Sequence, residues 1–240
     1  MISIVVPAFN RAELTERCYR SLRKHTDGAE VVLVDNASTD GTRDLHGLFD
    51  TVVWNRRNLG FGRACNQGAA VSSGQTFVFL NNDTEVTYRW LEPLVQAAER
   101  WGIAGPKLVY PDGRIQHAGV RLYRDGNGVL TAENIGRGEP DEGFDDPATV
   151  DAVTGACLAV RRDVFAVCGG FDLGYWNGYE DVDLCLTATS KDWMCRYVPA
   201  SKVVHLESES GPQRWTRVNE NVRRLQEKWG ERWPLSQTLI

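Results

Sequence analysis

Four short apolar segments in the first eighty residues limit the folds that this chain can adopt. They are rich in valine and other β-branched or aromatic residues, and each gives way abruptly to proline or to polar side chains. Their sequences are ISIVV (2–6), EVVLVD (30–35), TVVW (51–54) and TFVFL (76–80). Continuous apolar runs of this length are typical of strands that are buried on both faces, so the pattern predicts a mostly parallel sheet.

Helix-like segments lie between the predicted strands. Leu14, Cys18 and Leu22 recur at helical spacing after the first strand. A short second helix is expected after Ser38, Thr39 and Asp40, all of which are cap residues, and a third helix is expected from about 62 to 72. Strands that alternate with helices in this way predict an α/β fold, a Rossmann-like sheet flanked by helices on both faces.

Polar loops follow all four predicted strands. These loops are PAFN (7–10), DNAS (35–38), NRRNLGFG (55–62) and NNDTE (81–85). Because the carboxyl ends of parallel strands meet at one edge of a sheet, the four loops together predict a ligand-binding crevice. Neither G-x-G-x-x-G after the first strand nor G-x-x-x-x-G-K-[ST] occurs, which argues against a classical dinucleotide site and a P-loop site.

The composition fits a soluble domain. The 240 residues are 42% hydrophobic and 25% charged, and the net charge of −5 argues against a general nucleic-acid binder. The six cysteines include no C-x-x-C pair, which favours buried residues in a reducing compartment over a metal cluster or a disulfide framework. No apolar run approaches the roughly 20 residues that span a bilayer, so we expect a cytoplasmic protein without a transmembrane segment.

The second half of the chain has weaker patterns. Residues 106–123 indicate a hairpin around the turn sequence PDGR, and 195–207 has the character of a strand. The segment from about 124 to 149 is rich in Gly, Asp, Glu and Asn and poor in apolar residues. We therefore expect a long loop there, either disordered or folded over a ligand.

Residues 214–229 predict an amphipathic helix. Its apolar face would consist of Trp215, Val218, Val222, Leu225 and Trp229. We expect this face to pack on the body of the domain. Contact with an anionic membrane surface is the alternative, because the segment also carries Arg214, Arg217, Arg223, Arg224 and Lys228.

Five motifs, taken together, resemble a known family. They are IVVPAFN, VVLVDNASTDGT, NLGFGRACNQG, FLNNDTEV and GYEDVDLC. In order and spacing they are similar to the family-2 inverting glycosyltransferases of the GT-A fold, from residue 2 to about residue 210. The last motif and the GGFD before it look most like bacterial members that build rhamnose-containing and other surface polysaccharides.

The resemblance implies an organisation and a set of partners. It implies one GT-A domain over 1–240, with a nucleotide-sugar-binding half (1–105), an acceptor-binding and catalytic half sharing the sheet (106–210) and a C-terminal helix (211–240). The implied donor is a UDP-, dTDP- or GDP-sugar, and the implied cofactor is Mg²⁺ or Mn²⁺. The acceptor would be a hydroxyl of a saccharide or lipid-linked saccharide, which is compatible with a location at the inner face of the membrane.

A metal site is implied at Asp83 and His205. A divalent cation in such a site needs only one or two carboxylates besides the diphosphate oxygens and water. The motif in the family is Asp-x-Asp, and here Asn81 stands at its first position. The structural alternatives are a turn or helix cap at Asp83 and a hydrogen-bonded strand end at His205.

The resemblance assigns catalysis to the Glu-Asp pair of GYEDVDLC. Inversion by direct displacement needs one carboxylate that takes the proton of the acceptor hydroxyl. Asp181 corresponds to this base, and Glu180 to a residue that binds the acceptor or orients the base. Asp183 is the competing candidate, although we expect it to stabilise the helix, since acidic residues in a first turn complement the helix dipole.

The remaining implied contacts concern the two substrates. The donor would be bound by Pro7, Ala8, Asn10, Asp35, Gly60, Arg63, Asn82 and Asp83. Asp35 would contact the base or ribose, whereas Arg63 would reach phosphate or base unless it is an ordinary surface arginine. Trp176 and Tyr179 would stack on the acceptor sugar unless they pack in the core, and Gly155 would leave room for the sugars.

Two other functions compete with the transferase. A nucleotidyltransferase of similar architecture would need a Gly- and Arg/Lys-rich loop after the first strand, and PAFNRAE does not supply one. A nucleotide- or sugar-binding module without transferase activity is favoured by Asn81 and Asn82, because neither residue adds negative charge to the predicted metal site.

Overall fold

The computed structural model describes residues 1–206 and 217–233. Its elements, in chain order, are β1 (Ile2–Ala8), α1 (Ala12–His25), β2 (Ala29–Asp35), the 3₁₀ helix η1 (Gly41–Leu48), β3 (Thr51–Trp54), α2 (Phe61–Val71), β4 (Thr76–Leu80), β5 (Thr84–Val86), α3 (Leu91–Trp101), β6 (Gly102–Val109), β7 (Ile115–His117), β8 (Val120–Arg124), β9 (Leu130–Asn134), β10 (Ala148–Val150), β11 (Cys157–Arg161), α4 (Arg162–Val167), α5 (Glu180–Thr189), β12 (Met194–His205) and α6 (Val218–Trp229).

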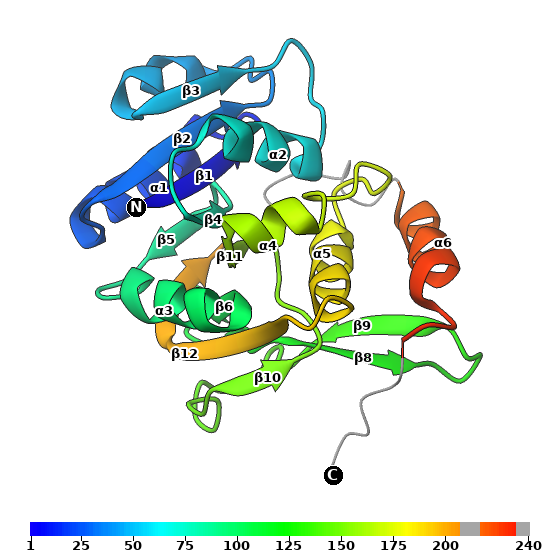
Figure 1. Ribbon diagram of the computed structural model, residues 1–240. Helices are drawn as coiled ribbons and strands as arrows, with labels where there is room; N and C mark the ends of the chain where they lie inside the picture. Colours follow the sequence, from blue (N-terminus) through cyan, green and yellow to red (C-terminus); the bar gives the residue numbers. More distant parts are fainter. Residues whose placement is uncertain (207–216, 234–240) are drawn as a thin grey trace.

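A ten-stranded sheet forms the centre of the molecule (Figure 1). Its main path runs β10-β12-β6-β11-β4-β1-β2-β3, with β5 paired to β12 and β7 paired to β6. The four predicted apolar strands are parallel neighbours in this sheet, as expected from their sequences. Strands from the second half of the chain extend the same sheet through β11, which pairs antiparallel with β4. A separate two-stranded sheet consists of β8 and β9.

Both faces of the central sheet are buried, which explains the continuous apolar runs. In β1, Val5 packs in the core cluster under α2 and α5, whereas Ile4 and Val6 pack in the cluster under α1 and α3. Helix α2 lies especially close to the sheet. A Cβ atom placed on its Gly68 would lie 2.3 Å from a methyl carbon of Val5, so only glycine allows this approach.

The segment 124–149 is largely ordered, which corrects the expectation of a long disordered loop. Residues Leu130–Asn134 form β9, which pairs with β8, and β10 pairs with β12. The intervening loop is tied down by buried Lys107, which lies 2.6 Å from Asp141 and 2.7 Å from Asp145. Lys107 lies far from both aspartates in the sequence, and β10 lies far from β12, so the composition of 124–149 alone did not reveal these contacts.

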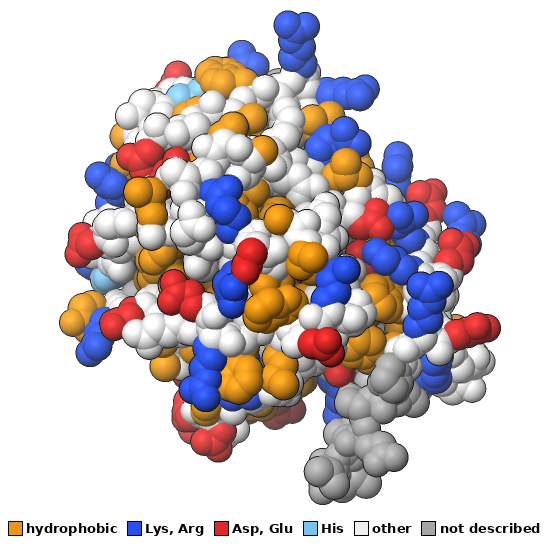
Figure 2. All heavy atoms as spheres, in the orientation of Figure 1, with side chains coloured by type: hydrophobic (Ala, Val, Ile, Leu, Met, Phe, Trp, Pro, Cys, Tyr) orange, Lys and Arg blue, Asp and Glu red, His pale blue; other side chains and the backbone are white. Residues whose placement is uncertain are grey.

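Helix α6 packs on the body of the domain, as expected. Leu225 and Trp229 are buried in the core cluster that contains α5. Arg224 and Lys228 form ion pairs with Asp172, and the visible surface over α6 mixes acidic and basic side chains (Figure 2). The apolar face is therefore not available to a membrane, while Trp215 and Arg214 lie outside the described residues.

The other structural expectations can be compared directly. Hairpin pairing occurs between β6 and β7 around the predicted turn, and 195–205 lies in β12. The short second helix is η1, and the side chain of Asp40 caps it by accepting from the backbone N–H of Thr42. All six cysteines are free, and five of them are buried. Within the described part of the chain, no helix is long and apolar enough to cross a bilayer.

Candidate functional site

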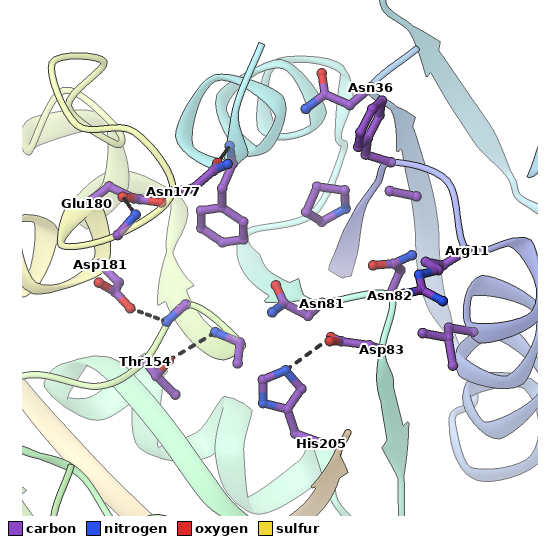
Figure 3. A pocket seen from close by; sticks show the side chains of 18 of the residues that line it. Arg11, Asn36, Asn81, Asn82, Asp83, Thr154, Asn177, Glu180, Asp181 and His205 are labelled. Atoms are coloured by element: carbon purple, nitrogen blue, oxygen red, sulfur yellow. Dashed lines mark hydrogen bonds and ion pairs between the residues drawn. The ribbon is translucent and has the colours of Figure 1, made fainter. Parts of the chain in front are cut away.

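A cavity of about 190 Å³ lies at the carboxyl ends of β1 and β4 (Figure 3). The end of β12, the residues before β11 and the start of α5 form its other walls. Eight of the predicted site residues line it, namely Pro7, Ala8, Asn82, Asp83, Gly155, Glu180, Asp181 and His205. The crevice expected from the polar loops is therefore present, and elements from both halves of the chain build it.

Asp83 and His205 face each other in this cavity. Asp83 follows β4, and His205 ends β12, so the backbones of two different elements bring them together. The Oδ1 atom of Asp83 lies 3.1 Å from Nε2 of His205, and both side chains are 7% exposed. A second contact, from the N–H of Leu206 to the carbonyl oxygen of Asp83 at 3.0 Å, holds the two segments in register.

Gln116 fixes the orientation of the His205 ring. Its amide nitrogen donates to the carbonyl oxygen of His205 at 3.3 Å, which leaves its amide oxygen 2.5 Å from Nδ1. An amide oxygen only accepts, so Nδ1 carries a proton and Nε2 is the ring nitrogen that faces Asp83. A ring nitrogen and a carboxylate oxygen that face each other at 3.1 Å need a proton or a cation between them.

The donor set of this pair suits a divalent cation that also binds the substrate. No cluster of three or more His, Cys, Asp or Glu side chains fit for a metal occurs within the described residues. Mg²⁺ and similar ions commonly use one or two protein carboxylates and take their remaining oxygens from phosphate and water. Asp83 and His205 therefore fit a cation held jointly with a ligand, rather than a closed metal site.

Asp181 lies across the cavity from this pair, in the first turn of α5 (Figure 3). Its Oδ2 accepts from the backbone N–H of Gly155 at 2.7 Å, and its Oδ1 accepts from the N–H of Val182 at 2.8 Å. These two bonds fix the orientation of the carboxylate.

Glu180 also lines the cavity. It is 4% exposed, and its Oε2 accepts from the N–H of Gly178 at 2.6 Å. The residue before it, Tyr179, has a φ of 71° and so places the chain in the left-handed region at the start of α5. This turn directs two successive carboxylates, Glu180 and Asp181, into the same cavity.

Asp183 faces away from the cavity and anchors α6. It is 2% exposed, and its carboxylate lies 2.7 Å from Nζ of Lys228 and 2.8 Å from Nε1 of Trp229. The hydroxyl of Tyr175 adds a third, longer contact at 3.3 Å. The expected structural role is therefore supported, although its partners are on another helix rather than on α5 itself.

We expect Asp183→Asn to lower the free energy of unfolding by about 2–3 kcal/mol, the range for hydrogen bonds to a charged group. The exposed ion pair of Glu227 with Arg223 supplies the control, because Glu227→Gln should change stability by less than about 0.5 kcal/mol. Urea denaturation of both variants measures the difference. Equal stability in the two variants would contradict the anchoring role.

Six predicted site residues lie outside the lining of the cavity: Asn10, Asp35, Gly60, Arg63, Trp176 and Tyr179. Asp35 is buried at the end of β2, where it accepts from the N–H of Ser38 at 2.7 Å and lies 3.1 Å from Nε2 of His46. Arg63 is exposed in the first turn of α2.

Trp176 and Gly60 instead hold two loops together at the rim of the cavity. A Cβ atom on Gly60 would lie 3.1 Å from the ring of Trp176, and Asn177 accepts from the N–H of Phe61 at 2.8 Å. The guanidinium of Arg217 lies 5.1 Å from the centre of the Trp176 ring. Tyr179 is partly buried against the core. Trp176 and Tyr179, which were expected to stack on the acceptor sugar, are therefore engaged in contacts with the protein.

Several lining residues were not singled out from the sequence. They are Phe9, Arg11, Leu14, Asn36, Asn58, Phe61, Gln116, His117, Asn134, Thr154, Asn177 and Gly178. Asn36 and Asn58 belong to polar loops that were predicted to form the crevice, and Arg11 directly follows PAFN. Gln116, His117 and Asn134 carried no such signal, because they come from the poorly patterned second half.

His117 is a neutral acceptor in the wall of the cavity. The pKa of His117 is lowered from 6.5 to about 4, chiefly by burial and to a smaller extent by His205, while the hydrogen bond to Asn134 opposes this shift. Its Nδ1 lies 2.8 Å from Oδ1 of Asn134, and the N–H of Thr154 points at Nε2 from 3.5 Å. Because the Asn134 oxygen accepts, Nδ1 carries the proton and Nε2 keeps its lone pair.

The lowered pKa of His117 predicts a loss of stability in acid. Below its ordinary pKa of 6.5 the unfolded chain binds a proton that the folded chain binds only near pH 4. The free energy of unfolding should therefore fall by about 2 kcal/mol between pH 7 and pH 5 on account of this residue. Urea denaturation at both pH values should show a smaller fall in His117→Gln, and parallel falls would contradict the assignment.

Comparison with known protein sequences places these features in context. The model of "Glycosyl transferase family 2" matches residues 3–169. The N-acetylglucosaminyl-diphospho-decaprenol L-rhamnosyltransferase of Mycobacterium tuberculosis is 30% identical over 246 residues, covering 88% of this chain and 77% of that protein. The O-antigen biosynthesis protein RfbC of Myxococcus xanthus is 31% identical over 225 residues, covering 87% of this chain but only 17% of that protein.

A further relative and two solved structures complete the comparison. The protein y4gI of Sinorhizobium fredii is 28% identical, and the match covers 95% of this chain and 27% of that protein. The structure of GalNAc-T7 with UDP, GalNAc and Mn²⁺ matches with a TM-score of 0.73 and 22% identity, over 95% of this chain and 48% of that chain. The mannosyltransferase PcManGT of Pyrobaculum calidifontis with GDP-Man and Mn²⁺ matches with a TM-score of 0.60 and 18% identity, over 89% of this chain and 59% of that chain. At these identities the two structures show a shared fold.

Proposed function

Because the chain belongs to glycosyl transferase family 2 and has the GT-A fold, we propose that it transfers a sugar from a nucleotide-diphosphate sugar to a hydroxyl of a glycan or glycoconjugate, with inversion at the anomeric carbon. One observation carries the proposal. Asp181, a carboxylate oriented by a backbone hydrogen bond, lines the same cavity as Asp83 and His205, two side chains whose donor atoms fit a divalent cation.

The proposed donor is a UDP-, dTDP- or GDP-sugar. Support comes from the similar structures, which hold UDP with GalNAc in one case and GDP-Man in the other. The nucleotide would lie along the ends of β1 and β4, on Pro7, Ala8 and Asn82. Contacts to Asn10, Asp35, Gly60 and Arg63 stay part of the proposal. In this arrangement 1–105 is the donor half of a single domain and 106–210 is the acceptor half.

The proposed cofactor is Mg²⁺ or Mn²⁺, held by Asp83 and His205. Both similar structures contain Mn²⁺, and Nε2 of His205 and Oδ1 of Asp83 lie 3.1 Å apart in this cavity. A divalent cation at such a site supplies a Lewis acid for the charge that develops on the diphosphate. The part of Gln116 is to hold the imidazole with Nδ1 protonated and Nε2 directed into the cavity.

The proposed general base is Asp181. Direct displacement requires one carboxylate near the acceptor hydroxyl, and Asp181 is already oriented by the N–H of Gly155. Glu180 would bind the acceptor hydroxyls beside it, since it is held in the same wall of the cavity.

The proposed acceptor is a saccharide or a lipid-linked saccharide. The M. tuberculosis relative is a rhamnosyltransferase whose name gives a decaprenol-linked saccharide as its substrate, and RfbC is an O-antigen biosynthesis protein. A lipid-linked acceptor would bring this protein to the inner face of the membrane. The acceptor would enter between Gly155 and the loop that carries Trp176 and Tyr179, with those rings at the rim.

Incubation of the protein with UDP-, dTDP- and GDP-sugars and Mn²⁺ tests the function. We expect release of the nucleoside diphosphate from one of them, at a rate that rises with a saccharide or lipid-linked acceptor. NMR of the product anomeric proton should show inversion. Binding of a nucleotide sugar with no release in any combination would favour the binding-module alternative.

A further inference from the structure

One part of the surface carries a local excess of positive charge, although the net charge of the whole chain is −5. The stretch 51–82 contains Arg56, Arg57 and Arg63 but no aspartate, glutamate or lysine. It forms β3, the loop that follows β3, α2 and β4. All three arginines are exposed, and none of them forms an ion pair with another described residue. Their guanidinium groups are therefore available to an anionic partner.

Two further arginines extend this positive surface, one on each side. The guanidinium of Arg43 lies 5.4 Å from the centre of the Trp54 ring, at the end of β3. Arg217 lies 5.1 Å from the centre of the Trp176 ring, and that ring packs against Gly60, just before α2. Arginines from three distant parts of the chain therefore meet around the loop between β3 and α2.

We call this surface the basic rim, and it consists of Arg43, Trp54, Arg56, Arg57, Arg63 and Arg217. Two acidic residues adjoin it: Asp44 follows Arg43 in the chain, and Glu220 lies 4.0 Å from Arg217. Figure 2 shows basic side chains along the upper right margin of the molecule, over the loop between β3 and α2, with no acidic side chains among them. The arginines of the rim therefore outnumber the acids beside it.

Trp54 adds an apolar side chain to the basic rim. It is 54% exposed, although the ring of His46 packs edge-on against it at 3.9 Å between ring centres. Tryptophan is enriched at membrane–water interfaces, because its ring is apolar while its N–H can stay hydrated. Surfaces that lie on anionic membranes combine such rings with arginine or lysine, which pair with the phosphates of the headgroups. The basic rim has both components.

The basic rim also borders the cavity. Asn58 directly follows Arg57 and lines the cavity, and Phe61 lines it two residues before Arg63. A flat lipid surface bound to the rim would therefore lie close to the proposed active site. A saccharide that is attached to a membrane lipid would be presented at that place.

We propose that the basic rim docks this protein on a membrane surface that contains anionic lipids. The inference rests on the proposed function, since a lipid-linked acceptor is what would make this location useful. Single-stranded RNA could also pair with arginine and stack on tryptophan. The net charge of −5 disfavours a long polyanion that wraps around the protein, whereas a flat membrane touches the rim alone.

Arg56→Gln/Arg57→Gln is the most informative variant, because both side chains are exposed and neither lines the cavity. The matched control is Arg20→Gln/Arg23→Gln, which removes the same charge from exposed positions on α1. Helix α1 packs in a different core cluster from α2, on the other face of the sheet. Trp54→Phe keeps an aromatic ring and removes the indole fluorescence.

Co-sedimentation with vesicles measures the docking. Wild-type protein should bind vesicles made of equal parts of phosphatidylcholine and phosphatidylglycerol, and should not bind vesicles of phosphatidylcholine alone. Added salt should weaken the binding, because it screens surface charges. Arg56→Gln/Arg57→Gln should bind about 10–30-fold more weakly, since each basic residue near an anionic surface contributes about fivefold. Arg20→Gln/Arg23→Gln should bind like the wild type, and brominated phosphatidylglycerol should quench the wild-type fluorescence more than that of Trp54→Phe.

Four results would overturn the inference. The first two are no binding of wild-type protein to the mixed vesicles, and an equal affinity or an equal loss in Arg56→Gln/Arg57→Gln and its control. Binding of wild-type protein to a single-stranded RNA in place of the vesicles would assign the basic rim to nucleic acid. Loss of nucleotide-sugar turnover by Arg56→Gln/Arg57→Gln without vesicles would assign these arginines to the donor site. The vesicle assay contains no nucleotide sugar, so failure of the proposed function is seen separately, as a lack of turnover with every donor.

Discussion

Replacement of Asp181 by asparagine is expected to lower turnover by about 10²–10⁴-fold, the usual contribution of a positioned general base. Asparagine cannot take the proton of an acceptor hydroxyl. Its amide oxygen can still accept from the N–H of Gly155, so the fold should change little, by about 1 kcal/mol in unfolding free energy. Steady-state rates at saturating donor and acceptor, together with donor binding by calorimetry, measure the effect.

Asp183→Asn is the matched control for this experiment. The two residues lie two positions apart on α5, but Asp183 contacts Lys228 and Trp229 rather than the cavity. We expect Asp181→Asn to lose activity with normal donor affinity, and Asp183→Asn to lose mainly stability. Full turnover in Asp181→Asn would exclude it as the base. The opposite pattern in the two variants would move the catalytic role two residues along the helix.

Replacement of Asp83 by asparagine is expected to remove the metal-dependent part of turnover, a loss on the order of 10²–10³-fold, since such a cation supplies several kcal/mol of charge stabilisation. The fold should be retained. The side chain of asparagine has both a donor and an acceptor, so it can still form a hydrogen bond with Nε2 of His205, which faces this position from 3.1 Å.

Titration of activity with Mn²⁺ and the electron spin resonance of bound Mn²⁺ in the presence of nucleoside diphosphate measure this loss. Glu85→Gln is the control, because Glu85 follows in the same segment and forms an exposed ion pair with Arg17. The variant should keep wild-type Mn²⁺ dependence. An Asp83→Asn protein that binds Mn²⁺ and turns over like the wild type would leave Asp83 with only a structural role.

Whether a segment could be predicted from the sequence depended on its position in the structure. Strands β1, β2 and β4 are buried on both faces over most of their length, so most of their residues must be apolar, and such a pattern is visible in the sequence alone. In the segment from β8 to β10, β8 and β9 pair with each other in a separate two-stranded sheet, and β10 pairs with the distant strand β12 at the end of the central sheet. The polar composition of this segment resembled that of a loop.

The residues of the candidate site also differ in whether the sequence pointed to them. Asp83, Glu180 and Asp181 occur in motifs next to element ends, and the family resemblance pointed to them before any contact was known. Gln116 and His117 come from a short strand without such a motif. Their part in the cavity depends on pairing between β7 and β6 and on contacts with residues as distant as His205.

The sequence by itself determined the parallel strands, the helices between them and the edge of the sheet at which a ligand binds. Burial of a strand and the periodicity of a helix each impose a pattern on a few neighbouring residues, so both can be recognised in a short stretch of sequence. Only the tertiary structure decided which polar side chains share the cavity. Arg11 enters it because contacts 28 residues away pin the left-handed turn of Asn10 and Arg11, and Asp183 is excluded because its partners lie 45 and 46 residues away on α6. Such contacts depend on how distant elements pack, and no local pattern of residues specifies them.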